Sequence, residues 1–324
     1  MILTKVRNFN FNQLKYAATL ALLSCTFAAT FTAFGRPPLQ ISVLLTQNTD
    51  AYQSFVDALQ TQLRRTLGDQ AQIQVQSGET PAEDAATLLV AVGWPAAQRV
   101  LRRDPSIPVI ATFFSQYSIT ADLTRYEPQR LAPLTVLYLD QPVERYLRLI
   151  RAALPHATRV GVLYGPSSRK QSTALRAAAQ RDRFTLKEVE LTAQDNVVRV
   201  LDSLLAMIDV LLVLPDPEVS SDKNVYPLLL SSYRRGIPVI GFSKAYVHAG
   251  ALAAVYSTPQ QLGQQTATMI IHFLQSNPRH FPPPQPPVDF QISVNPSVAR
   301  SLGLTMPDEQ ALYQHVRAFE AVSR

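Results

Sequence analysis

The chain has 324 residues, of which 47% are hydrophobic, and this length is enough for two domains with separate cores. Its formal net charge is +6, but the first 15 positions carry three of the basic residues, so the remaining surface is only mildly basic. No block of Lys and Arg with interleaved aromatics is present, which argues against nucleic acid as a partner. The single cysteine, Cys25, excludes an intramolecular disulfide, so the core alone must hold the fold.

The amino-terminal stretch has the pattern of a secretory signal. Residues 1–15 are basic and contain no acid, and residues 16–35 contain no charge. Three outcomes fit this pattern: cleavage after Gly35, with small residues at positions 33 and 35, lipidation of Cys25 at an approximate lipobox, or retention of residues 16–35 as a membrane anchor. We favour cleavage and assign residues 1–35 to a signal peptide or membrane anchor.

In the first half of the remaining chain, short apolar runs alternate with amphipathic stretches. The pattern predicts a strand at 39–45, a helix at 51–67 capped by Asp50, an edge strand at 72–76, a buried strand at 88–92, a helix at 96–103 and a strand at 107–112. Residues 113–133 are irregular, and a strand at 134–139 leads into the second half.

The second half continues in strict strand and helix order, which favours a parallel sheet with helices on both faces. Strands are predicted at 160–164, 186–191, 210–214 and 237–241, with helices at 143–154, 168–181, 196–207 and 225–235. The apolar run 251–256 follows too soon for a long crossover helix and is predicted as a return strand. A helix at 259–274, a proline-rich link at 278–287, an edge strand at 288–294 and closing helices at 296–321 complete the chain.

The two halves match each other strand by strand. Runs at 41–46, 88–93 and 107–115 correspond in order to runs at 160–164, 210–215 and 237–243. Both members of the third pair contain Ile-Pro-Val-Ile followed by aromatic and hydroxyl residues. Three matched strands in one order predict an α/β protein with two doubly wound parallel-sheet lobes of like topology.

Five segments carry a family resemblance, and they lie at 93–98, 159–166, 233–243, 249–254 and 295–304. On these residues the chain resembles ABC transporter substrate-binding proteins of the type I periplasmic-binding-protein superfamily, in the tryptophan/tyrosine-type branch. The resemblance spans roughly residues 39–320. It departs from the family pattern at 113–118, where Phe-Phe-Ser-Gln-Tyr-Ser stands in place of the usual Asp-Pro-Val turn.

The resemblance implies three chain crossings between the lobes, near 138–141, 255–258 and 284–288. An amino-terminal lobe would then contain residues 36–138 and 257–285, and a carboxyl-terminal lobe residues 139–256 and 286–324. The expected fold is periplasmic binding protein-like I, with lobes joined by a three-stranded hinge that can close around a ligand.

Motifs for catalysis are absent from the sequence: it contains no nucleophile elbow, phosphate loop, dinucleotide fingerprint or His-Glu-x-x-His. The five histidines are scattered without metal spacing. Asp216 and Glu218 flank a proline after a strand, which fits a turn with a helix cap. Asp216 is also a candidate counter-charge for an ammonium group. We therefore expect no enzyme, no metal and no cofactor.

Ligands of open α/β sheets bind at the carboxyl ends of the strands, and aromatic, hydroxyl and amide groups there suit a small organic molecule. Alternative interpretations remain for three of these residues: Ser168 as a helix N-cap, Trp94 as a packing residue between lobes, and Asp216 as a turn residue. The candidate ligand-binding residues are Gln47, Tyr52, Gly93, Trp94, Phe114, Ser115, Tyr164, Ser167, Ser168, Asp216, Ser243, Tyr246 and Tyr256.

These observations predict an exported, periplasmic solute-binding protein that holds a small organic ligand between its lobes, an amino acid being the family-based candidate. An ABC permease as partner is implied by the resemblance, and contact with the membrane is expected only through the amino-terminal segment. The alternative from another class is a membrane-anchored periplasmic ligand sensor. An enzyme on the same scaffold is a third hypothesis, which the missing nucleophile and base pair disfavour.

Overall fold

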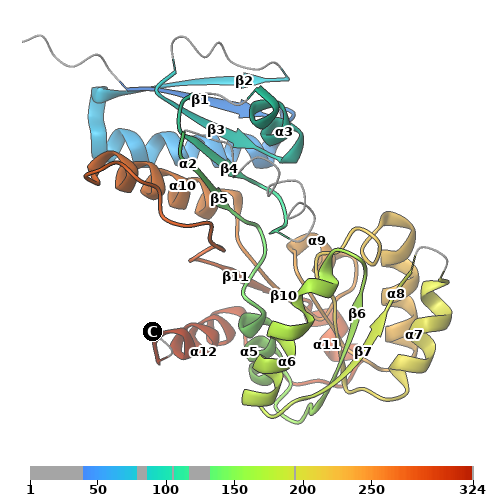
Figure 1. Ribbon diagram of the computed structural model, residues 1–324. Coiled ribbons are helices and arrows are strands. Elements are labelled where there is room, and N and C mark those ends of the chain that lie inside the picture. The colour runs from blue at the N-terminus through green and yellow to red at the C-terminus, as the bar shows by residue number, and fades with distance from the viewer. Residues whose placement is uncertain (1–38, 79–85, 104–105, 117–131, 193–194, 323–324) are drawn as a thin grey trace, which may run out of the picture. The chain divides into compact units, whose positions relative to one another are not determined.

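The computed structural model describes residues 39–78, 86–103, 106–116, 132–192 and 195–322, which form two α/β units, each built on its own sheet (Figure 1). The predicted signal or anchor segment at 1–35 lies outside the described residues. None of the helices in the described part is both long and apolar enough to cross a bilayer.

The first sheet has five parallel strands in the order β2-β1-β3-β4-β5. Every residue of the central strands β3 and β4 is buried, whereas the edge strand β2 alternates between half-buried and exposed residues. This is the burial expected for parallel strands covered by helices on both faces. The strands are β1 (Leu39–Leu45), β2 (Ala71–Ser77), β3 (Leu88–Val92), β4 (Val109–Thr112) and β5 (Leu134–Leu137).

Within the described residues, three helices cover the first sheet. Helices α2 (Asp50–Leu67) and α10 (Pro259–Gln275) share a core with one face, and α3 (Trp94–Arg103) packs on the other. The predicted cap of α2 is wrong by one residue. Thr49 has an extended backbone and its hydroxyl accepts the Tyr52 N–H at 3.4 Å, whereas Asp50 is already in the first helical turn.

Helices α2 and α10 lie side by side although they are far apart in the sequence (Figure 1). Gly263 makes this approach possible, because a Cβ there would overlap the backbone oxygen of Phe55 and lie 3.0 Å from the Cβ of Ala58. A helix from the late part of the chain therefore completes the core that contains Phe55 and Leu59 of α2.

The second sheet has six strands in the order β11-β10-β9-β8-β6-β7. All neighbours are parallel except the edge strand β11, which pairs antiparallel with β10. The strands are β6 (Arg159–Tyr164), β7 (Thr185–Glu190), β8 (Val210–Leu212), β9 (Val239–Gly241), β10 (Ala253–Tyr256) and β11 (Gln291–Val294).

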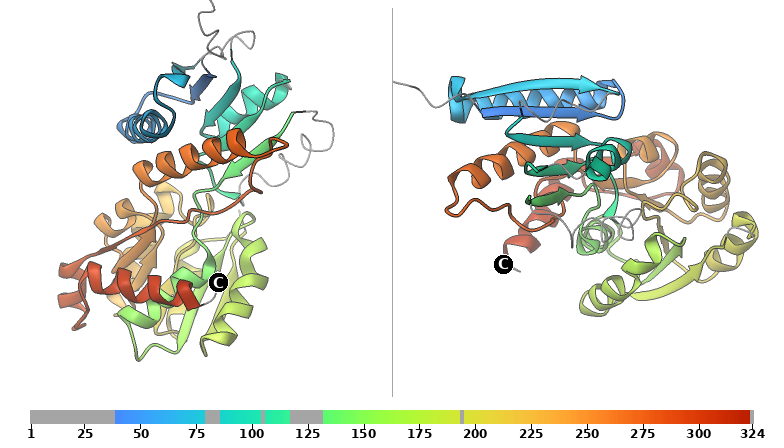
Figure 2. Two further views of the ribbon diagram at one scale, coloured as in Figure 1. Left: turned by 90° about the vertical axis from the view of Figure 1, so that its left-hand side faces the viewer. Right: turned by 45° about the horizontal axis from the view of Figure 1, so that its top comes forward.

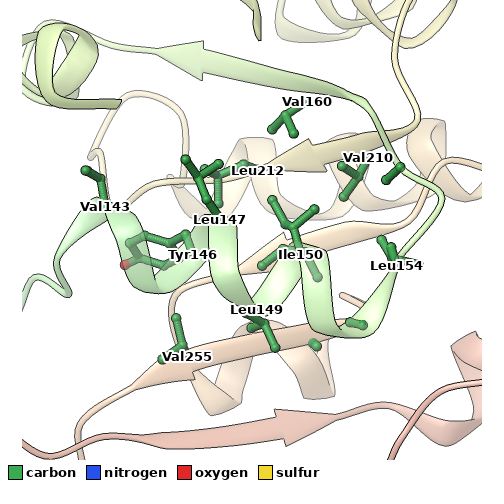
Figure 3. Close-up of a cluster of buried hydrophobic side chains, with 14 of the residues drawn as sticks. Val143, Tyr146, Leu147, Leu149, Ile150, Leu154, Val160, Val210, Leu212 and Val255 are labelled. Atoms are coloured by element: carbon green, nitrogen blue, oxygen red, sulfur yellow. The ribbon is translucent and has the colours of Figure 1, made fainter. Parts of the chain in front are cut away.

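Helices lie on both faces of the second sheet. On one face, Tyr146, Leu147 and Ile150 of α5 gather with Val160 and Val210 of the strands, and this cluster is fully buried (Figure 3). The carboxyl-terminal helix α12 lies against α5 on the same side (Figure 2). The helices are α5 (Val143–Ala153), α6 (Ser172–Arg181), α7 (Val197–Leu205), α8 (Asp222–Arg234), α9 (Lys244–His248), α11 (Pro296–Ser301) and α12 (Glu309–Val322).

Both sheets repeat one strand order. In the first sheet the chain runs 2-1-3-4-5, and in the second sheet β7-β6-β8-β9-β10 follows the same order before β11 is added. The matched sequence runs form β1 and β6, β3 and β8, and β4 and β9, which occupy equivalent positions. The prediction of two doubly wound lobes of like topology is confirmed.

Three predicted helices start at least two residues away from the predicted position. Helix α3 begins at Trp94 and not at Ala96. The helix predicted from Ser168 begins with a tight 3-10 turn at Ser168–Gln171, and α6 starts only at Ser172. Helix α8 begins three residues before the predicted Val225, because Ser221 has the extended backbone of an N-cap and Asp222 favours the first turn. Between β9 and β10 the chain forms only the five-residue helix α9, in agreement with the expected absence of a long crossover.

The chain passes three times between elements of the first sheet and elements of the second. It does so between Leu137 and Val143, between Tyr256 and Pro259, and between Gln285 and Gln291. The third passage is fixed to the first sheet, since Gln285 pairs in parallel with Leu137 and its N–H donates to Val136 at 3.0 Å.

Candidate functional site

At the carboxyl end of the first sheet, Thr46 and Gly93 flank the point where the strand order reverses. Connections from β1 and β3 leave in opposite directions, so this is the topological switch point at which α/β sheets bind ligands. The Thr46 hydroxyl donates to the Val92 carbonyl at 2.9 Å and accepts the Ala96 N–H at 3.2 Å. Thr46 thus fixes the start of α3 against the end of β3.

Gly93 is required by both its conformation and its neighbours. Its φ of 88° lies in the left-handed region, and a Cβ would overlap the Thr46 hydroxyl and lie 2.7 Å from the Tyr52 hydroxyl. Burial raises the pKa of Tyr52, and a hydrogen bond with Thr46 opposes this shift. The half-buried Tyr52 ring is therefore neutral at physiological pH and closes one side of the switch point.

Two consecutive aromatic residues follow β4 and diverge. Phe113 has a φ of 69°, which is uncommon for a residue with a side chain and marks a strained turn. Its ring makes edge-to-face pairs with the rings of Tyr52 and Phe55, at centroid distances of 5.1 and 5.4 Å. Phe114 instead makes an edge-to-face pair with Trp94 at 5.5 Å. We call residues 113–116 the aromatic turn.

The aromatic turn is held by Asp140, which is not among the predicted ligand-binding residues. Its carboxylate accepts the Ser115 hydroxyl at 2.7 Å and the Gln116 N–H at 2.5 Å. Burial raises the pKa of Asp140, and these two hydrogen bonds oppose the shift. The Leu139 N–H also donates to the Phe114 carbonyl at 3.1 Å. Asp140 is the one acidic residue in the predicted crossing 138–141, and this was the sequence feature that could have pointed to it.

In the second sheet, Asp216 occupies the corresponding switch point between β6 and β8. Its Oδ2 accepts the Ser168 N–H at 2.6 Å and its Oδ1 accepts the Glu218 N–H at 2.9 Å. The Ser168 hydroxyl accepts the Gly165 N–H at 3.1 Å, and a Cβ on Gly165 would overlap the Asp216 carboxylate. Because Asp216 accepts the Ser168 N–H, these contacts link the two loops that follow β6 and β8.

Two more predicted residues, Ser243 and Tyr246, lie at and in the short helix α9. The Ser243 hydroxyl caps α9 by accepting the Tyr246 N–H at 3.2 Å. The Tyr246 ring packs beside Phe242 at a centroid distance of 5.2 Å, and its side chain is 4% exposed. Its hydroxyl is buried without a hydrogen-bond partner among the described residues, and burial raises its pKa. Tyr246 therefore packs in the hydrophobic core of the second sheet.

Two predicted tyrosines bond to neighbouring strands. The Tyr164 hydroxyl donates to Glu188 at 3.0 Å from a side chain buried in the core, and burial raises its pKa. The Tyr256 hydroxyl shares a hydrogen bond of 2.8 Å with Ser293 on β11, and Tyr256 lines a depression of about 410 Å³ along that edge strand.

The structure thus brings together part of the predicted set. Tyr52, Gly93, Trp94, Phe114 and Ser115 form one cluster at the carboxyl end of the first sheet, with the exposed Gln47 after β1. On the second sheet, the half-buried Ser167 and Ser243 lie on loops at the same end of their strands. No group of three or more metal-ligating side chains occurs within the described ranges.

Comparison with known proteins gives a consistent result. A family model described as ABC transporter substrate binding protein matches residues 52–317. A tyrosine-binding protein from Clostridioides difficile is 24% identical over 241 residues, which cover 69% of this chain and 68% of that protein.

Two solved structures share the fold. The ligand-free, open structure of a substrate-binding protein with adhesive properties from Clostridium difficile has a TM-score of 0.68 at 24% identity, covering 84% of this chain and 97% of that one. An ABC domain from Streptococcus pneumonia in complex with L-Trp has a TM-score of 0.56 at 20% identity, covering 84% and 96%. Both likenesses agree with the two-lobed architecture.

Proposed function

The chain belongs to the family of ABC transporter substrate-binding proteins, and we propose that it captures an aromatic amino acid at the carboxyl ends of its two sheets for delivery to a membrane permease. The observation that carries this proposal is the aromatic cluster at the switch point of the first sheet. It contains the ring pair Trp94 and Phe114, the neutral Tyr52 whose hydroxyl lies close to Gly93, and the polar Ser115 that follows Phe114.

Ring faces and edges in this cluster suit a flat apolar side chain. The Trp94 ring is half-buried, so part of it stays available to a ligand, while Phe114 supports it from the buried side. Neighbouring groups of the first sheet, Gln47 and Ser115, supply amide and hydroxyl groups for the polar end of the ligand. The names of two relatives, a tyrosine-binding protein and an L-Trp complex, support the same ligand class.

Ligand-dependent stability tests the proposal. We expect L-tyrosine or L-tryptophan to raise the free energy of unfolding by about 2.7 kcal/mol at a concentration one hundred times the dissociation constant. L-Leucine and D-tryptophan serve as comparison ligands. Failure of the protein to bind any aromatic amino acid would contradict the proposed ligand class.

Matched variants locate the site. Trp94→Ala should weaken binding at least tenfold, which corresponds to about 1.4 kcal/mol. Tyr226→Ala is the control, because Tyr226 is 69% exposed on α8 and belongs to no part of the proposed site. Equal affinities of Trp94→Ala, Tyr226→Ala and the unchanged protein, measured by titration calorimetry, would remove Trp94 from the site.

Export is part of the proposal and rests on the charge pattern of residues 1–35. Fractionation of cells that express the full chain should release the protein with the periplasmic contents after osmotic shock. Retention in the membrane fraction would favour the anchored sensor over a released carrier.

A further inference from the structure

Residues 140–145 hold a continuous set of contacts that reaches from the aromatic turn to the other two passages between the sheets. Asp140 binds the aromatic turn through Ser115 and Gln116, as described above. The next residue, Gln141, is also buried, and its side-chain amide donates to the Ser257 hydroxyl at 2.9 Å. Ser257 lies in the second passage, and its hydroxyl in turn donates to the Asp289 carbonyl at 2.5 Å in the third.

Arg145, in the first turn of α5, extends this set of contacts by bonding to Gln141. It is 3% exposed, and its Nη1 donates to the Gln141 side-chain oxygen at 2.7 Å and to the Pro287 carbonyl at 2.8 Å. Its Nη2 donates to the Val288 carbonyl at 2.8 Å. One side chain therefore joins the first passage to the third.

Arg145 also reaches the carboxyl-terminal helix. Its Nε donates to one oxygen of Glu320 on α12, and its Nη2 donates to the other at 3.2 Å. All five N–H groups of the guanidinium are thereby used, and its carbon lies 4.5 Å from the centroid of the Phe290 ring. A lysine has three donors on a flexible stem and cannot reproduce this planar arrangement.

A second arginine, Arg317, also binds Glu320, the carboxylate partner of Arg145. Arg317 donates to the Val288 carbonyl at 3.0 Å and to Glu320 at 3.2 Å. Glu320 is therefore held by two arginines. Helix α12 is tied to the third passage directly through Arg317, and indirectly through Glu320 and Arg145. A buried guanidinium with a paired carboxylate has one defined geometry, because separating the pair would leave an uncompensated charge.

We propose that Asp140, Gln141 and Arg145 are positioning residues that couple the aromatic turn to all three passages and to α12, so that the geometry of the ligand-contact turn depends on the geometry of the hinge. The proposal rests on the proposed function in one respect, namely that the aromatic turn contacts the ligand. The coupling itself is a property of the ligand-free protein. Binding at the turn and rotation about the passages would then be linked events.

Hydrogen–deuterium exchange in the ligand-free protein tests the coupling directly. Arg145→Lys should speed exchange of the Gln116 amide at least tenfold, although the five donors of Arg145 bond to other residues. The matched control is Arg159→Lys, which weakens the ion pair with Asp209 at the start of β6, outside the network. Rates are compared at equal global stability, set with urea and read from the slowest amides of β3. Faster exchange limited to residue 288, with Gln116 unchanged, would overturn the coupling.

A second variant and a binding measurement complete the test. If Arg145→Lys does not fold, Glu320→Gln weakens the same network from α12 and should give the same change at Gln116. Titration with L-tryptophan and L-tyrosine should show weaker binding in the network variant than in Arg159→Lys, and equal affinities would overturn the link to the ligand. Absence of binding in the unchanged protein would contradict the proposed function, while the exchange experiment would still decide the coupling.

Discussion

The Asp216 carboxylate accepts the backbone N–H of Ser168 at 2.6 Å, although the two residues follow different strands of the second sheet. Its other oxygen accepts the Glu218 N–H, so a single buried acid holds the ends of the β6 and β8 loops together. The equivalent point of the first sheet uses a neutral hydroxyl, that of Thr46, which bonds to Val92 and Ala96.

Asp216→Asn should therefore destabilise the protein by about 2 to 3 kcal/mol. Both carboxylate oxygens of Asp216 accept backbone N–H groups, and the asparagine NH2 group cannot accept one. Urea denaturation measures the change in the free energy of unfolding. Asp222→Asn is the control, since Asp222 is an exposed first-turn acid of α8 and should change stability by less than about 0.5 kcal/mol. Equal effects of the two variants would contradict the structural role of Asp216.

Tyr246→Phe should leave stability unchanged or raise it by about 1 kcal/mol, because it removes a buried hydroxyl that has no partner in the described structure. Tyr164→Phe is the matched control, and it should lower stability by about 1 kcal/mol since that hydroxyl donates to Glu188. Thermal unfolding of both variants checks the difference. Loss of L-tryptophan binding in Tyr246→Phe would show instead that the hydroxyl contacts the ligand.

Gly263→Ala should destabilise the protein by about 1 to 3 kcal/mol, because the added Cβ overlaps the Phe55 carbonyl on α2. In an uncrowded helix the same change would stabilise by about 1 kcal/mol. Thr268→Ala, at an exposed position of the same helix, is the control and should lie within about 0.5 kcal/mol of the unchanged protein. A stabilising Gly263→Ala would mean that α2 and α10 are not in close contact.

Asp209→Asn should lower the stability of the protein at pH 7, and the difference from the unchanged protein should disappear in acid. Hydrogen bonds from Arg159 hold the pKa of Asp209 well below its usual value, so the carboxylate stabilises the fold above the unfolded pKa of about 3.9. That contribution disappears as the pH falls through the lower folded value, and the two proteins should then converge. Asp202→Asn, which opens an exposed pair with Arg235, is the comparison. A constant difference at all pH values would exclude ionisation of Asp209 as the cause.

The sequence was informative about the fold because the strand runs are short, β-branched and ordered alike in both halves. The Ile-Pro-Val-Ile pair predicted equivalent strands, and β4 and β9 occupy equivalent positions. Helix boundaries were less predictable, since they depend on backbone geometry. Asp50 and Thr49 are both good caps, and only the extended conformation of Thr49 decides between them.

The candidate site was only partly predictable, because a strand-end residue can face the ligand, the core or another loop. Trp94 is half-buried and pairs with Phe114, whereas Tyr246 and Tyr164 at equally suitable sequence positions are buried in the core. Asp140 was missed because its partners lie 24 and 25 residues away and no local pattern reports them.

The cover of α2 by α10 has a consequence for the order of events during synthesis. As the chain grows, α2 is complete long before α10, and in between all the strands of the second sheet except β11 must be made. The nascent amino-terminal half therefore lacks the helix that completes the core around Phe55 and Leu59. A polypeptide that stops before residue 259 would leave this core incomplete permanently, and we expect such fragments to aggregate or to be recognised by chaperones.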